Sequence, residues 1–215
     1  IQGSVEYLAK QTSKPVFFDA EHFFDGYKSD SGYAIATVQA AVDGGAQRVI
    51  LCDTNGGVMP HEVAAAIQEV NATVTGVKLG IHVHNDGGLA VANTLRAIEE
   101  GAIQVQGTIN GLGERCGNAN LCSVLANVML KEPYVSELQT NISLEGLKKL
   151  TSTSRLLDKI LNRAPNRHAA YVGPSAFAHK GGLHVSAVQK DPRTYEHVEP
   201  ELVGNQRHVL VSDQA

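Results

Sequence analysis

Cysteine is scarce in this chain and is not arranged for cross-linking. The 215 residues include only 3 cysteines, at Cys52, Cys116 and Cys122, with no Cys-x-x-Cys pair among them. An odd and scattered set of thiols does not build a disulfide framework, which excludes the small disulfide-rich secreted domains. The cytosol, where thiols stay reduced, is therefore the compartment that we expect.

Long apolar runs and a surplus of basic residues are also lacking. No stretch approaches the roughly 20 apolar residues of a membrane-spanning helix, and no signal-peptide pattern opens the chain. The net charge of -4, with the positive charges dispersed, excludes a nucleic-acid-binding surface, which needs concentrated Lys and Arg. The remaining composition, 43% hydrophobic and 19% charged, is that of an ordinary globular protein with a buried core.

Short β-rich runs alternate with longer segments of helical spacing in the first half of the chain. We predict strands at 16–18, 49–52, 79–83 and 104–108, and helices at 4–11, 33–42, 62–70 and 89–98. Glycines follow three of these helices, at Gly44-Gly45, Gly76 and Gly101. The unit repeats about every 30 residues, the size of a βα unit. Repeated βα units predict a parallel sheet with helices outside it.

Polar side chains follow the carboxyl end of every predicted strand. A (β/α)8 barrel draws its site from many strands at this end, whereas an open doubly wound sheet concentrates it at one switch point. The pattern therefore favours half of a TIM barrel over a small doubly wound sheet. Because a barrel needs about eight strands and roughly 250 residues, we expect the chain to be part of a longer protein. The polar residues are Asp19, Glu21, Asp53, Thr54, His82, His84, Thr108 and Asn110.

The βα rhythm stops after Glu132-Pro133. Ser143 can cap a helix that carries leucines at 144, 147 and 150, and an apolar stripe continues as far as Pro165. From residue 166 the sequence is rich in Gly-Pro, Gly-Gly, Asp-Pro and Glu-Pro pairs, which are typical of loops. We therefore predict two domains, an α/β domain at 1–132 and a small helical and loop-rich subdomain at 133–215.

His82 and His84 form the most informative pair in the chain, in the segment His-Val-His-Asn-Asp. Side chains alternate along a strand, so these two imidazoles point to the same side. A lone buried histidine is usually structural, but a pair on one face at the end of a strand favours a divalent cation. Asn85 and Asp86 are interpreted as turn formers or as groups that orient an imidazole.

A glycine-rich loop, 110–120, precedes a predicted helix. It is either a flexible connection or an anion site, because the free N–H groups of a helix start favour negative charge. Glu114, Arg115 and Asn118 make it unusually polar for a connection. Glu21 is either a surface acid or a group facing the barrel mouth, and the Thr54 hydroxyl either binds substrate or caps a turn. A Cys116 nucleophile is the weakest of these interpretations.

Four motifs together carry a family resemblance. They resemble the acyl-CoA condensing metallolyases, the 2-isopropylmalate, homocitrate and citramalate synthases, and the likeness extends over nearly the whole chain. The first two motifs resemble most closely the citramalate synthase branch. The motifs are FDAEHFFDGY at 18–27, LCDTNGG at 51–57, HVHND at 82–86 and NGLGERCGNA at 110–119.

The resemblance implies a role for each matching residue. His82, His84 and Asn118 match metal ligands, Glu21 a catalytic glutamate and Thr54 a threonine that holds the substrate carboxylate. Glu114 and Arg115, in the glycine-rich loop, are predicted to bind substrate together with Thr54. In the family the segment around 177–184 reaches into a neighbouring subunit, and His184 and Tyr195 match catalytic residues contributed in trans. The implied assembly is a homodimer that exchanges its linker subdomains, with His179 only shaping the loop.

The implied fold is the C-terminal half of the barrel, strands 5–8, followed by the linker subdomain. The implied reaction is a condensation of acetyl-CoA with an α-keto acid, in the citramalate branch pyruvate on the isoleucine route. Mg or Mn is expected rather than Zn, because the ligand set has no thiolate. The family's Arg-Asp pair on a first strand has no counterpart before Ser4. The isolated chain should therefore bind metal weakly and show no turnover.

Several alternatives remain open at the level of sequence. A 2-isopropylmalate or homocitrate synthase would use the same motifs with another keto acid. An aldol-type CoA lyase of the same superfamily would need a cysteine in the glycine-rich loop, where Cys116 lies. A non-catalytic fragment could act as an assembly module, and an unrelated α/β metal-binding protein is the most distant reading.

Overall fold

The computed structural model describes residues 1–210 and divides into two compact units, Ile1–Asn120 and Leu121–Ala215. The two units are described separately below. The sequence-based division was placed after residue 132, so the two divisions differ by helix α6 (Leu121–Leu130), which stands in the second unit. Residues 211–215, the end of the predicted linker subdomain, lie outside the described residues.

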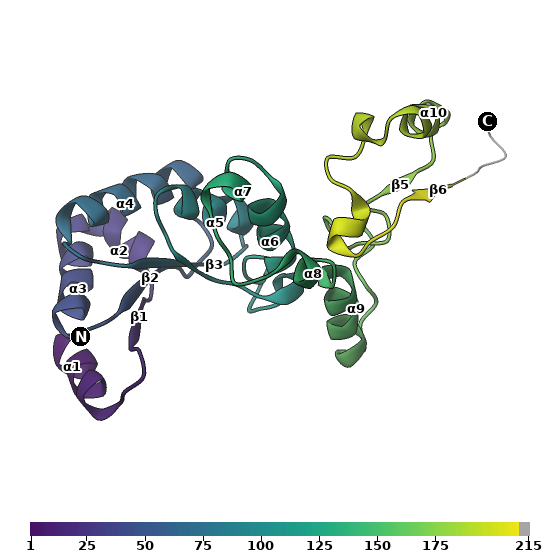
Figure 1. Ribbon diagram of the computed structural model, residues 1–215. Coiled ribbons are helices and arrows are strands. Elements are labelled where there is room, and N and C mark those ends of the chain that lie inside the picture. The colour runs from purple at the N-terminus through teal and green to yellow at the C-terminus, as the bar shows by residue number, and fades with distance from the viewer. Residues whose placement is uncertain (211–215) are drawn as a thin grey trace. The chain divides into compact units, whose positions relative to one another are not determined.

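The first unit is built on a four-stranded parallel sheet in the order β1-β2-β3-β4 (Figure 1). The strands are β1 (Phe17–Ala20), β2 (Arg48–Asp53), β3 (Leu79–Val83) and β4 (Gln104–Gln106). The third begins and ends as predicted, the first runs slightly later and the fourth ends earlier. All neighbouring pairs run parallel, as the βα rhythm indicates, and the register places Cys52, His82 and Gln106 side by side.

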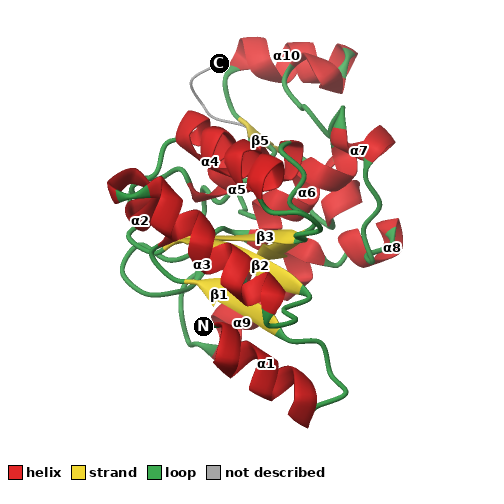
Figure 2. Ribbon diagram, turned by 90° about the vertical axis from the view of Figure 1, so that its left-hand side faces the viewer, coloured by secondary structure: helices red, strands yellow, loops and turns green. Residues whose placement is uncertain are grey.

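Helices cover one face of this sheet (Figure 2). They are α1 (Gln2–Gln11), α2 (Phe23–Ser29), α3 (Ser31–Asp43), α4 (Pro60–Thr73) and α5 (Ala90–Glu99), with a short 3-10 turn η1 (Ile109–Gly111). Helix α2 was not predicted, because seven residues are too few to show a helical period. It forms because Phe23 and Phe24 are both buried, with 3% and 2% of their surface exposed.

The helix-facing side of the sheet forms the core of this unit. In β2 and β3 the residues that alternate toward the helices are fully buried, and these two strands contact α2, α3 and α5. Glycine ends two of the predicted helices as expected, since Gly45 and Gly101 follow the caps of α3 and α5 with positive φ, at 94° and 97°. Helix α4 ends earlier, at Thr73, and Gly76 lies in the turn beyond it. The fully buried residues include Val49, Leu51, Ile81 and Val83 of the strands and Val63, Ile67 and Val70 of α4.

The opposite side of the sheet is polar and curved. Arg48 Nη1 donates to Gln104 Oε1 at 2.6 Å, and Gln106 Nε2 donates to Asp19 Oδ1 at 3.1 Å. Asp19 and Gln106 lie on the two edge strands, which in a flat sheet are three strand spacings, or about 14 Å, apart. Their side chains meet because the sheet curls toward its polar side. This curvature is that of a barrel wall with its inner face polar.

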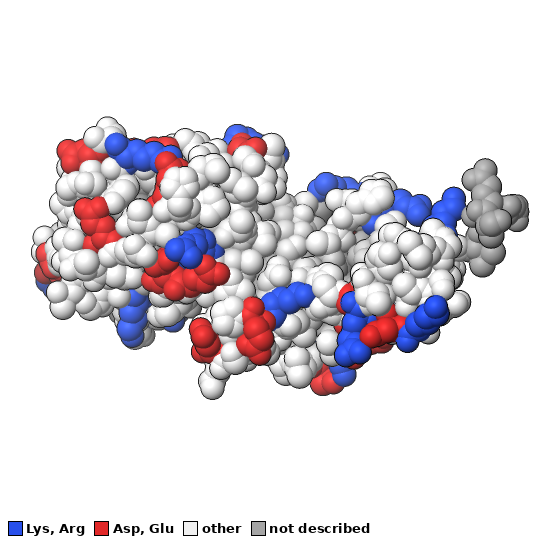
Figure 3. Space-filling model, turned by 90° about the horizontal axis from the view of Figure 1, so that it is seen from above, with Lys and Arg blue, Asp and Glu red and all other residues white. Residues whose placement is uncertain are grey.

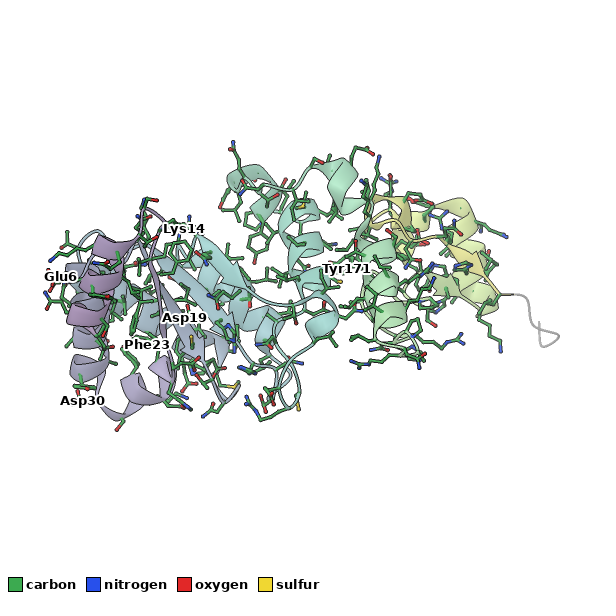
Figure 4. The ribbon with its side chains drawn as sticks, turned by 90° about the horizontal axis from the view of Figure 1, so that it is seen from below. Glu6, Lys14, Asp19, Phe23, Asp30 and Tyr171 are labelled. Atoms are coloured by element: carbon green, nitrogen blue, oxygen red, sulfur yellow. The ribbon has the colours of Figure 1, made fainter. Side chains whose placement is uncertain are left out.

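The second unit contains helices and two very short strands. Its elements are α6 (Leu121–Leu130), α7 (Tyr134–Glu137), α8 (Leu144–Leu147), α9 (Leu150–Ile160), β5 (Ala178–His179), α10 (Gly182–Lys190), η2 (Pro192–Thr194), η3 (Pro200–Val203) and β6 (His208–Val209). Strands β5 and β6 pair in parallel. Figure 4 labels Tyr171, whose hydroxyl donates to Asn127 Oδ1 at 2.9 Å and so ties the loop to α6.

Two details of this unit differ from the sequence prediction. Ser143 does cap a helix, since its Oγ accepts from Gly146 N at 3.1 Å. The expected continuous stripe is nevertheless broken, because α8 ends at Leu147 and α9 begins again at Leu150. The glycine pair at 181–182, read as loop, instead begins helix α10. Glycine is compatible with a helix start as well as with a turn, so composition alone did not separate the two.

The helices that the structure describes are short, the longest having 14 residues. In the part of the chain that is described, no helix is both long and apolar enough to cross a bilayer. Lys and Arg side chains lie among Asp and Glu side chains over the face drawn in Figure 3. This distribution agrees with the dispersed charge expected from the sequence.

A buried carboxylate holds the β5–β6 pair together. Glu196, whose side chain is 3% exposed, accepts from Arg207 Nε at 2.7 Å and Nη2 at 2.6 Å. His179 Nε2 contacts the same carboxylate at 3.1 Å. The Arg207 hydrogen bonds hold the pKa of Glu196 below its usual value, and His179 contributes in the same direction. Glu196 is thus charged in the folded unit and stabilises it through this charge.

Stability should therefore fall with acid in a way that depends on Glu196. A carboxylate with a lowered folded pKa contributes its full stability above the ordinary value of 4.5 and loses it as pH falls through the folded pKa. We expect the free energy of urea unfolding to fall more steeply below pH 4.5 in the wild type than in Glu196→Gln. Glu145→Gln, at a side chain 78% exposed, is the matched control and should leave the pH profile unchanged. Parallel profiles for wild type and Glu196→Gln would contradict this linkage.

Candidate metal and substrate site

Strand β3 presents the two histidines at the carboxyl edge of the parallel sheet. The rings of His82 and His84 lie on the same side, with centroids 5.3 Å apart and planes inclined by 49°. His84 stands just beyond the strand, where its backbone N–H donates to Asp53 O at 3.1 Å. The alternation of the strand and this backbone bond together make the two imidazoles converge.

The glycine-rich loop brings Asn118 to the histidines. Its Nδ2 lies 3.0 Å from His82 Nε2, and its backbone forms an isolated antiparallel bridge with His84. The loop fits closely around this amide, because a methyl group at Gly113 would overlap Asn118 Oδ1. Gly117, with φ of 88°, is equally required, since a Cβ there would overlap the Gly111 carbonyl oxygen. These glycines are needed because the backbone and the Asn118 amide lie too close to them for a side chain to fit, and not because they make the loop flexible.

This cluster fits a cation through two imidazoles and one amide. The Nδ1 atom of His84 is buried and has no hydrogen-bond partner among residues 1–210, an arrangement that costs free energy unless another group satisfies it. Within residues 1–210 there is no cluster of three or more His, Cys, Asp or Glu side chains that could hold a metal. The three side chains of the cluster could therefore supply only part of a coordination shell, which oxygen ligands from elsewhere would complete.

Glu21 and Thr54 stand together at the same edge of the sheet. The Thr54 hydroxyl donates to Glu21 Oε2 at 2.7 Å and accepts from the backbone N–H of His22 at 2.8 Å. The Thr54 hydroxyl therefore donates its proton to the hydrogen bond with Glu21, and this bond holds the carboxylate in one orientation. An exposed, oriented carboxylate at a strand end is suited to proton transfer.

Arg115 is bound within the chain. Its Nε and Nη2 donate to the two oxygens of Asp86 at 2.7 and 3.0 Å, and Nη2 also donates to the Thr54 carbonyl at 2.7 Å. The Arg115 hydrogen bonds hold the pKa of Asp86 below its ordinary value. These hydrogen bonds link the loops that carry Arg115, Asp86 and Thr54 at the edge of the sheet. Glu114 is exposed, and a substrate role for either residue stays a prediction.

Asp53 and Cys52, at the end of β2, are both buried and are not exposed at the site. Asp53 is 2% exposed and accepts from the backbone of Gly57 at 3.2 Å and of Val58 at 3.3 Å, so it anchors the loop after β2. Burial raises its pKa. Burial, with the nearby Glu21 and Asp19 charges, also raises the pKa of Cys52 to about 12, which keeps that thiol protonated and unreactive.

In the second unit His184 and Tyr195 lie together. Their rings stack with centroids 4.0 Å apart, and Tyr195 is 42% exposed. His179 is instead buried against Glu196, which agrees with its expected role in shaping the loop. The predicted pair is thus an accessible surface feature of this unit.

Gln106 was not among the residues singled out from the sequence. It contacts His82 Nδ1 through its Oε1 at 2.8 Å and Asp19 through its Nε2 at 3.1 Å. The sequence did contain a signal for it, because Gln104 and Gln106 are two residues apart on a strand and therefore point to the same face. That face is the one that carries the histidines.

Comparison with known proteins identifies the family to which the chain is similar. Residues 3–156 match the HMGL-like family model, and residues 171–215 match a homocitrate synthase post-HMGL domain-like model. The chain is 56% identical over 99% of its length to an (R)-citramalate synthase of Geobacter sulfurreducens and 52% identical over 100% of its length to that of Aquifex aeolicus. It is 40% identical over 92% of its length to a 2-isopropylmalate synthase of Heliobacterium modesticaldum. The chain spans 39%, 40% and 38% of these three relatives.

Solved structures show the same fold at low identity. The hydroxymethylglutaryl-CoA lyase of Pseudomonas aeruginosa superposes with a TM-score of 0.61 at 20% identity, over 77% of this chain and 56% of the lyase. The carboxyl transferase domain of Rhizobium etli pyruvate carboxylase superposes with a TM-score of 0.57 at 16% identity, over 90% of this chain and 32% of that one. The predicted α/β fold, part of a TIM barrel followed by a small helical subdomain, is confirmed.

Proposed function

The chain belongs to the HMGL-like family, and on this premise we propose that it forms part of an enzyme that condenses acetyl-CoA with an α-keto acid. Pyruvate is the proposed acceptor and citramalate the proposed product, as the names of the relatives with 48–56% identity suggest. The observation that carries the proposal is the convergence of His82, His84 and Asn118 beside Gln106. A cation held there would activate the keto acid for such a condensation.

The proposed metal ligands are His82, His84 and Asn118. When bound there, a divalent cation would polarise the keto group of the acceptor and make its carbonyl carbon electrophilic. The buried Nδ1 of His84 supports the assignment, since no group in the described part of the chain hydrogen-bonds to this nitrogen. Mg or Mn is proposed rather than Zn, because the site has no thiolate and would include oxygen ligands.

The proton chemistry is assigned to Glu21 and, from the second unit, to His184 and Tyr195. Glu21 is oriented by Thr54, and its exposed carboxylate can accept or return a proton at the substrate. The stacking of His184 on Tyr195 keeps the imidazole beside the phenol, so both can act on one substrate. We propose that the second unit delivers this pair to the site of a partner subunit, in a homodimer that exchanges its linker subdomains.

The test is an assay of the full-length protein that carries these residues. Free CoA is measured by thiol reaction with pyruvate, 2-ketoisovalerate or 2-oxoglutarate as acceptor, with Mn²⁺ or Mg²⁺ present. We expect CoA release with pyruvate to exceed that with either other acid by at least about 100-fold, since a pocket can discriminate added groups by about 3 kcal/mol. Mass spectrometry should identify citramalate. CoA release with none of the acids would overturn the proposal.

Cys116→Ala separates synthase from lyase in the same assay. The thiol is exposed and lies in the glycine-rich loop. A condensing enzyme does not need it, so the variant should keep at least about half of the wild-type rate, within the range of a neutral surface change. Near-complete loss, together with cleavage of an acyl-CoA substrate by the wild type, would favour the lyase.

A further inference from the structure

We propose that Gln106 and Asp19 are positioning residues for His82. They place the ring proton on Nδ1 and thereby leave the lone pair of Nε2 for the cation. The inference rests on the proposed function, because it concerns the cation assigned there. It concerns residues to which the sequence motifs give no role.

The three side chains form a relay across the inner face of the sheet. His82 on β3 and Gln106 on β4 are direct partners in the parallel register, and His82 Nδ1 lies 2.8 Å from Gln106 Oε1. Gln106 Nε2 lies 3.1 Å from Oδ1 of Asp19, which Figure 4 labels on β1. The relay therefore depends on the curl of the sheet, which brings its two edge strands together.

The direction of each hydrogen bond follows from the carboxylate. An ionised Asp19 has acceptors only, so the amide end that faces it must be the NH2 group. The amide oxygen of Gln106 then faces His82 and can only accept, which requires the ring proton to be on Nδ1. The other ring nitrogen, Nε2, is left with its lone pair, and it is this atom that Asn118 contacts at 3.0 Å.

A fixed tautomer matters because a metal ligand must present an unprotonated nitrogen. Groups that hold the far nitrogen of a ligating histidine orient the ring and typically change metal affinity by 10–100-fold when removed. A glutamate at 106 would place a second carboxylate against Asp19, so glutamine suits both neighbours. Gln104 provides a matched control, since it lies two residues earlier on the same face and binds Arg48 instead.

The experiment uses the full-length protein, free of metal and labelled with ¹⁵N in its histidines. In the wild type, the ring-nitrogen shifts of His82 should show a protonated Nδ1 and an unprotonated Nε2. In Gln106→Leu the two tautomers should mix, and in Asp19→Asn a partial mixture is expected because the amide can then turn. Calorimetric titration should show Mn²⁺ binding about 10–100-fold weaker for Gln106→Leu, with Gln104→Leu within about twofold of the wild type.

The outcomes separate this inference from the proposed function. Gln106→Leu with an unchanged tautomer and unchanged Mn²⁺ affinity would overturn the relay while leaving the condensation intact. A wild-type protein that keeps the Nδ1–H tautomer but binds no Mn²⁺ would overturn the proposed function, and with it the purpose of the relay. Melting temperatures of the variants close to that of the wild type exclude unfolding as the cause of weaker binding.

Discussion

Replacement of His82 by alanine in the full-length protein is expected to lower kcat/KM for the condensation by at least about 1,000-fold. This loss corresponds to about 4 kcal/mol of transition-state stabilisation, a size that fits removal of the electrophilic centre of the reaction. The variant loses a proposed ligand and also leaves Gln106 and Asn118 without their shared partner. The measurement combines the rate of CoA release with metal content determined by mass spectrometry.

His84→Ala should behave in the same way, because its ring shares the site. It should differ from His82→Ala in stability, since it removes a buried nitrogen that has no partner among the described residues. His61→Ala, at an exposed position on helix α4, is the matched control and should leave rate and metal content unchanged. A His82→Ala protein that retains its full metal content and near-normal turnover would contradict the assignment of the metal site.

The elements that the sequence predicted well are those specified by local patterns. Strand β3 was placed correctly because it is apolar, bounded by Gly76 and followed by polar residues. The convergence of His82 and His84 was predicted for the same reason, since a period of two is a local property of the backbone. Helix ends at Gly45 and Gly101 followed from the preference of glycine for positive φ.

The contacts that escaped prediction join residues far apart in the sequence. Gln106 lies 24 residues from His82 and 87 from Asp19, and no periodicity relates such positions. Their meeting depends on the register of β3 with β4 and on the curl of the sheet, which only the fold specifies. The engagement of Arg115 with Asp86, 29 residues away, escaped for the same reason, although both lay in recognised motifs.

Burial also decided roles that residue type left open. Asp53 and Thr54 are neighbours, and both are polar. Asp53 is buried and accepts hydrogen bonds from backbone amides, whereas Thr54 donates a hydrogen bond to Glu21. Their alternation on the strand explains the difference, because Asp53 belongs to the helix-facing side with Val49 and Leu51. Residue type alone made both of them candidates for the functional site. The direction in which each side chain points distinguishes their roles.

Gly113→Ala is expected to damage the site about as strongly as removal of a side chain in it. The added methyl group would overlap Asn118 Oδ1, so either the loop or the amide must move. A displacement of about 1 Å in a catalytic arrangement can cost about 100-fold in rate, and we expect a loss of this order in kcat/KM. Mn²⁺ affinity should fall as well, because the displaced amide is a proposed ligand.

Two comparisons make this prediction specific to Asn118. Gly26→Ala, in helix α2 with no heavy atom within 4 Å of the new methyl group, should keep full activity and gain about 0.5–1 kcal/mol of stability. If Gly113 acts through the amide, then adding Gly113→Ala to Asn118→Ala should cost little, so the double-mutant cycle should show strong coupling. Additive losses in that cycle would mean that the methyl group harms the enzyme by another route. The close packing of a glycine against one amide would then have no part in placing the cation.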